Sequence, residues 1–206
     1  MVSGSSLVFN QERPEREWSV FMLQEKFGEP SELVRKKVKP EMDAMVRDFI
    51  AHAPFAVLAT ANAEGDCDAS PRGGTPGFFK VLDNKRLVIP DIAGNKLFQS
   101  FQNVESNPHA GLVFMIPGCD WTVRVNGRAT RVDSESDLID GLSPETLWED
   151  DNTKVIQGLL VEVDEAYAHC PRAFLFSKLW DLDRLGESLQ ADPNRYWFDR
   201  WREGAP

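Results

Sequence analysis

The sequence contains few of the residue types that build metal centres, disulfide frameworks or histidine-based active sites. Its 206 residues include three histidines and three cysteines. Cys67, Cys119 and Cys170 are odd in number and far apart, which indicates reduced thiols and a cytoplasmic protein. His169 beside Cys170 has no partner at the spacing of a zinc site, so we expect no bound metal.

Several motifs and composition signals are also missing. There is no GxGxxG after a strand pattern, no GxxxxGK[ST], no GxSxG and no HExxH. No apolar run approaches the roughly 20 residues of a membrane helix, and we expect no signal peptide. A net charge of −10 argues against a nucleic-acid partner, which would need a broad basic face. An enzyme of this composition would rely on a bound cofactor for its chemistry.

Short segments of β type dominate the middle of the chain. Apolar or alternating patterns predict strands over residues 55–60, 67–70, 78–82, 86–89, 109–116, 121–132 and 155–163. Helical patterns are found over residues 12–27, 40–54, 95–105, 133–151 and, in shorter form, 164–180. Pro40 is the expected start of the second helix, and Gly127 predicts a bulge or bend in its strand. This order favours a mainly β, Greek-key-like barrel with helices.

Two loops carry residues suited to an anion. After the strand that ends at Pro90, Gly94 allows a turn, Asn95 is placed to cap the next helix, and Lys96 adds a charge where helix N–H groups are free. The earlier loop Ser70–Gly77 is rich in glycine and contains Arg72, whose forked guanidinium suits phosphate. Each loop also has a simpler interpretation, an ordinary capped helix with a solvated lysine and a bulged connection with a surface arginine.

These segments resemble a known family. The patterns "ASPRGG.PGF..VLD...L.IPD..GN", "NPHAGLVFMIPG" and "RVNGRA" between Phe55 and Val132 are similar to the pyridoxamine 5′-phosphate oxidase-like FMN-binding split-barrel flavoproteins, and "HCPRAFLFSKLWD" extends the likeness to Asp181. The resemblance implies a six-stranded Greek-key split barrel that forms a homodimer with FMN between the subunits. The implied layout is an N-terminal helical extension over 1–53, the FMN-binding barrel over 54–181, and a C-terminal tail over 182–206 that packs on the barrel or the partner subunit.

The resemblance also implies a set of cofactor-binding residues. The FMN phosphate would be held by Arg72, Lys96 and the backbone of Gly94 and Asn95. The backbone of Ile89 and Pro90 would lie along the flavin ring. The second subunit would contribute Arg172, Ser177 and Trp180.

Two departures from the family pattern bear on activity. Phe176 stands where similar proteins often carry a basic residue, which removes one cofactor contact. The chain ends in "WFDRWREGAP" and lacks the Arg-Leu-x-Pro ending of a true pyridoxamine phosphate oxidase, so vitamin B6 oxidation is not the expected activity.

The resulting hypothesis is an FMN-dependent oxidoreductase that acts on a small-molecule substrate or electron donor, with no residue assigned as catalytic acid or base. One alternative is a flavin-binding carrier without turnover. Another is a reductase that uses the deazaflavin F420, whose longer polyanionic tail favours a more basic groove than a chain of charge −10 offers. Neither the substrate nor the electron donor follows from the sequence.

Overall fold

A computed structural model describes residues 20–94, 96–133, 135–136, 138 and 155–204. The chain divides into two units, Met1–Lys36 and Lys37–Pro206. The first unit contains α1 (Val20–Phe27) and most of α2 (Glu32–Lys37), and α2 buries no side chain. The start of the first predicted helix and most of the predicted acidic helix over 133–151 lie outside the described residues. No helix in the described ranges is long and apolar enough to cross a membrane.

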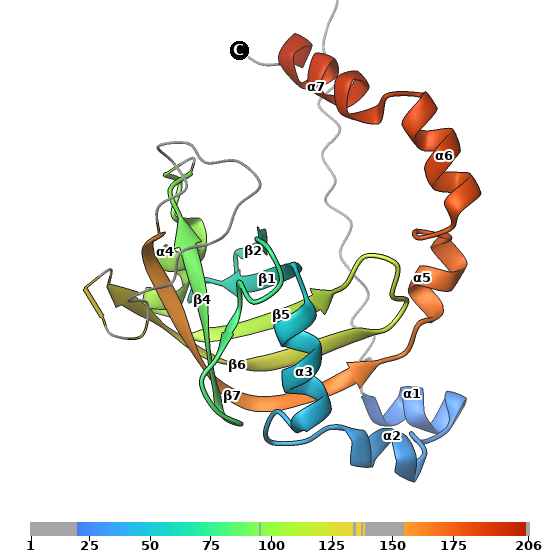
Figure 1. Cartoon of the computed structure of the whole chain (residues 1–206). Coiled ribbons are helices and arrows are strands. Elements are labelled where there is room, and N and C mark those ends of the chain that lie inside the picture. Colours follow the sequence, from blue (N-terminus) through green and yellow to red (C-terminus); the bar gives the residue numbers. More distant parts are fainter. Residues whose placement is uncertain (1–19, 95, 134, 137, 139–154, 205–206) are drawn as a thin grey trace, which may run out of the picture. The chain divides into compact units, whose positions relative to one another are not determined.

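The second unit is built on one antiparallel sheet of seven strands, drawn as arrows in Figure 1. The strands are β1 (Phe55–Ala61), β2 (Cys67–Gly73), β3 (Lys80–Val81), β4 (Arg86–Ile92), β5 (His109–Met115), β6 (Thr122–Asp133) and β7 (Val155–His169). Their order across the sheet is β2-β1-β5-β6-β7-β4-β3. Among the described strands no backbone pairing joins β2 to β3 or β4, so the sheet is not closed. This confirms the predicted mainly β fold of split-barrel type.

The strand count exceeds the six that the family resemblance implies because β3 is a separate strand of two residues. It pairs only with Leu87 and Val88 of β4. The predicted strand over 78–82 is therefore shorter than expected. Phe78 lies in a turn, where its N–H donates to the Thr75 carbonyl at 3.0 Å, and its side chain joins the hydrophobic core.

The long β6–β7 pair contains the predicted bulge at Gly127. The register shifts between Asn126 and Gly127. A Cβ atom on Gly127 would stand 2.1 Å from the backbone oxygen of Glu162, so only glycine permits the two strands to approach this closely.

The prediction of a helical segment over 164–180 is wrong for its first part, because β7 continues as a strand to His169. There the partner strand is available, and β7 pairs with β6 from Glu165 opposite Asn126 to His169 opposite Thr122. The helix α5 covers only Arg172–Ser177. The tail, for which the sequence predicted no helix, forms α6 (Leu182–Gln190) and α7 (Pro193–Gly204).

Helix α3 (Ala44–His52) packs against the sheet and starts later than predicted. Asp43 is extended, and its carboxylate accepts a hydrogen bond from the Val46 N–H at 2.9 Å, so Asp43 and not Pro40 begins the helix. Val46 and Ile50 are buried in the main core. The core also contains Phe79, whose ring meets those of Phe78 and Phe114 edge-on at centroid distances of 5.0 Å.

Candidate functional site

A cavity of about 380 Å³ lies where β2, the end of β4 and the first turn of α4 (Gln99–Ser106) meet. Its charged lining residues are Asp68, Arg72, Asp91 and Lys96. The two sequence segments predicted to bind an anion are therefore brought together in space.

The start of α4 differs from the prediction of a helix over 95–105. Lys96 and Phe98 have φ values of 62° and 51°, the left-handed region, so the chain turns before it enters the helix. Phe98 occupies the N-cap position, and no side chain of a described residue caps the helix there. The N-cap position therefore falls on Phe98, and Asn95, the predicted cap, lies outside the described residues. A helix end without a side-chain cap leaves backbone N–H groups for another acceptor, such as an anion.

A buried network of side chains forms one wall of the cavity. The Arg72 guanidinium donates from Nη1 to Asp91 Oδ1 at 2.6 Å and from Nη2 to Ser100 Oγ at 3.2 Å. Ser100 Oγ donates to Asp68 Oδ2 at 2.7 Å, and Gln157 Nε2 donates to Asp91 Oδ2 at 3.1 Å. The Arg72 and Asp91 side chains are 17% and 10% exposed. Arg72 Nε is fully buried and finds no hydrogen-bond partner within the described part of the chain.

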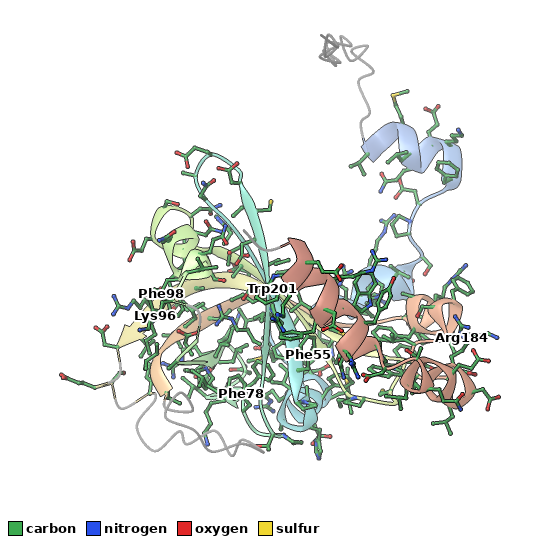
Figure 2. All side chains as sticks on the ribbon, turned by 90° about the horizontal axis from the view of Figure 1, so that it is seen from above. Phe55, Phe78, Lys96, Phe98, Arg184 and Trp201 are labelled. Atoms are coloured by element: carbon green, nitrogen blue, oxygen red, sulfur yellow. The ribbon has the colours of Figure 1, made fainter. Side chains whose placement is uncertain are left out.

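The two cations of the cavity differ in their exposure and in their ion-pair partners. Arg72 forms an ion pair with Asp91 and is nearly buried. Lys96 is exposed and makes no ion pair with any residue that the structure describes. Figure 2 shows Lys96 and Phe98 close together on the segment before α4. Lys96 and the uncapped helix end are thus the groups best placed to meet an incoming anion.

Of the residues predicted for the cofactor, Arg72, Gly94 and Lys96 line the cavity, whereas Ile89 and Pro90 do not. Ile89 and Pro90 are buried in β4 and pair with β7 on one side. On the other side β3 reaches only Leu87 and Val88. Beyond Val88 that edge of β4 has no partner among the described strands, a setting in which proline is tolerated.

The three predicted contacts from the C-terminal segment do not line the cavity of their own chain. Arg172 and Ser177 are exposed on α5, where the Arg172 guanidinium lies 5.1 Å from the centre of the Phe176 ring. Trp180 is tied elsewhere, because its Nε1 donates to the Cys119 carbonyl at 3.0 Å. Their predicted role at the cofactor remains a prediction.

Four further residues of the site were not predicted from the sequence: Asp68, Asp91, Ser100 and Gln157. One sequence feature could have identified Asp91. An acidic residue at the end of the apolar run "LVIPD" would be buried, and a buried carboxylate would need a cation as its partner. Ser100 and Gln157 had no such feature, since their partners lie on other elements. No group of residues able to hold a metal ion occurs in the ranges that the structure describes.

Part of the sequence matches a known protein family. Residues 42–155, more than half of the chain, match the family model described as pyridoxamine 5′-phosphate oxidase. No protein of curated function matches the sequence. Similar solved structures include a tagged form of HupZ from Group A Streptococcus, with 17% identity, 60% of this chain and 90% of that chain covered, and a TM-score of 0.45.

Two further structures are similar at the same level. A candidate pyridoxamine 5′-phosphate oxidase from Lactobacillus delbrueckii has 18% identity, covers 63% of this chain and 95% of its own, and gives a TM-score of 0.45. HutZ, a heme storage protein from Vibrio cholerae, has 16% identity, covers 62% and 93%, and gives a TM-score of 0.41. On the match over residues 42–155, the chain belongs to the pyridoxamine 5′-phosphate oxidase family.

Proposed function

We propose that this chain is an FMN-dependent oxidoreductase that binds FMN non-covalently, with the phosphate at the first turn of α4. One observation carries the proposal. Lys96, the uncapped end of α4 and the guanidinium of Arg72 converge on a single cavity. A phosphate ester meets in this cavity both the backbone donors and the cations that such groups require.

The charges of the cavity indicate which groups would do the binding. Asp68 and Asp91 oppose the two cations, so the four side chains carry no net formal charge. Asp91 already balances Arg72. Binding of a phosphate would therefore depend on Lys96 and on the dipole of α4, while Arg72 would contribute donors that are held in place.

The surroundings of the cavity fit the flat part of a flavin. Leu97 and Phe98 line the cavity and are 65% and 40% exposed, which gives an aromatic ring an apolar surface to cover. Ile89 and Pro90 are buried and do not line the cavity, so their contact with the flavin ring stays a prediction. Bound FMN would supply hydride and electron transfer, and the protein would orient it and exclude water.

A second copy of the chain would complete the site. Arg172, Ser177 and Trp180 do not line the cavity of their own chain, so their predicted contacts require the partner subunit. Leu175 and Phe176 on the same segment are 55% and 73% exposed, an apolar surface that an interface would cover. We therefore include a homodimer in the proposal.

The direct test is the visible spectrum of the purified full chain, before and after addition of FMN. We expect a flavin band and release of a molecule with the mass of FMN on denaturation. A protein that stays colourless and leaves the fluorescence of added FMN unchanged would refute the proposal. A released mass corresponding to F420 would replace FMN as the cofactor.

Stopped-flow reduction of the bound flavin by NADH or NADPH then separates an oxidoreductase from a carrier. We expect reduction within the turnover times of ordinary enzymes, on the order of seconds or less. Flavin that is bound but not reduced by either donor would favour the carrier.

A further inference from the structure

We propose that Asp91 is a positioning residue, which holds Arg72 across the split between β2 and β4 and thereby shapes the anion cavity at α4. The inference rests on the proposed function, because it concerns how the same cavity is kept ready for a phosphate ester. It assigns to Asp91 a role that acts through Arg72 and not through contact with the ligand.

The Arg72–Asp91 ion pair joins two strands that are not neighbours in the sheet. β2 is one end strand, and β4 is the second strand from the opposite end. No backbone pairing joins β2 to β4 among the described residues, yet Arg72 and Asp91 meet at 2.6 Å with both side chains largely buried. A side-chain contact therefore links β2 and β4 at a point where no backbone pairing among the described residues joins them.

Asp91 is itself held at both of its carboxylate oxygens. Oδ1 accepts from Arg72, and Oδ2 accepts from Gln157 of β7. Arg72 in turn reaches Ser100 in the first turn of α4, and Ser100 donates to Asp68 of β2. Continuous hydrogen bonds thus run from β7 through β4 and β2 to the helix end, and a connected buried network of this kind holds its members in place.

Electrostatics determines whether removal of the Asp91 charge should strengthen or weaken FMN binding. A carboxylate that only stood near the bound phosphate would repel it, and its removal would strengthen binding. A carboxylate that positions the guanidinium has the opposite effect, because its removal frees Arg72 to leave the cavity wall. The direction of the change therefore distinguishes the two roles.

The experiment measures FMN and riboflavin affinity of Asp91→Asn by fluorescence titration. We expect FMN to bind about tenfold or more weakly, a loss of about the size of one charge-assisted hydrogen bond. Riboflavin lacks the phosphate, so its affinity should change by less than about threefold. The matched control is Asp83→Asn, which removes one charge from an exposed ion pair with Arg86 and should leave both affinities within about twofold.

A second variant decides the question if Asp91→Asn does not fold. Gln157 donates to Asp91 and does not line the cavity, so Gln157→Leu can affect a ligand only through the network. We expect it to weaken FMN binding about threefold or more and to leave riboflavin binding unchanged. In a folded Asp91→Asn background its effect should be smaller, because the carboxylate that both Arg72 and Gln157 bind is already gone.

The outcomes separate this inference from the proposed function. Tighter or unchanged FMN binding by Asp91→Asn, or by Gln157→Leu where the first variant is unfolded, overturns the positioning role and leaves the proposed function intact. Equal losses for FMN and riboflavin also overturn it, because they indicate general damage. If the wild-type chain binds inorganic phosphate but not FMN, the proposed function fails and the same variants are judged by phosphate titration. If it binds neither, both fail.

Discussion

The replacement Lys96→Ala measures most directly how much the exposed ammonium of Lys96 contributes to the free energy of FMN binding. Lys96 is exposed and has no ion-pair partner in the described residues, so its removal leaves no buried charge behind. An ammonium about 4 Å from a unit negative charge in water is stabilised by about 1 kcal/mol. For a phosphate dianion, which carries twice that charge, the stabilisation is about 2 kcal/mol. We therefore expect FMN to bind roughly 30-fold more weakly.

Fluorescence titration of FMN at low and at about 1 M salt checks this value, because an exposed charge pair is screened at high ionic strength. The difference between wild type and Lys96→Ala should shrink as salt is added. Riboflavin affinity should not change, and the free energy of unfolding should stay within about 0.5 kcal/mol.

The matched control is Lys80→Ala, which removes an exposed lysine from β3 that does not line the cavity. It should leave FMN binding unchanged. The reasoning is refuted if Lys96→Ala binds FMN within about twofold of wild type, or if Lys80→Ala weakens binding as much.

Two further predictions concern the fold that supports the cavity. Gly127→Ala would place a Cβ atom 2.1 Å from the Glu162 carbonyl oxygen, so the bulge must widen. We expect the free energy of unfolding in urea to fall by about 1–3 kcal/mol. An unchanged urea midpoint would contradict the close approach of the two strands. Asp43→Ala removes the N-cap of α3 and should cost about 1 kcal/mol at neutral pH. Hydrogen bonds from Lys39 and then from the Val46 N–H lower the pKa of Asp43 below its ordinary value of 3.8, so its stabilising effect is complete above that value and is lost as the pH falls through the lowered pKa. The urea midpoints of wild type and Asp43→Ala should converge in acid, and a constant difference down to about pH 2 would refute this.

The sequence alone was sufficient for features that depend on neighbouring residues. Alternation of apolar and polar side chains, together with short apolar runs, predicted most of the strands, because a strand with one buried face repeats every two residues. Gly127 predicted the bulge, since a backbone that must come this close to another tolerates no side chain. The motifs between Phe55 and Asp181 predicted the family, and the match of residues 42–155 to the family model confirms it.

Local rules failed where the conformation depends on a partner or on an unusual backbone. β7 continues to His169 because β6 offers it a partner over that length, which no pattern within residues 164–169 reveals. α4 starts at Gln99 because Lys96 and Phe98 adopt the left-handed conformation. Non-glycine residues rarely do so, and local propensity does not foresee it.

The role of Arg72 shows most clearly what the tertiary structure alone decided. By its sequence, Arg72 is a cation in a glycine-rich loop, equally suited to bind a phosphate or to lie on the surface. The fold brings Asp91 of β4 and Ser100 of α4 to its guanidinium, although they are 19 and 28 residues away in the chain. Burial then makes the ion pair with Asp91 obligatory, because a charge removed from water must be paired. The sequence thus determined that a cation stands at this site. The packing of distant strands decided that Arg72 is held in the wall of the cavity, whereas Lys96 has no ion-pair partner in the part of the chain that the structure describes.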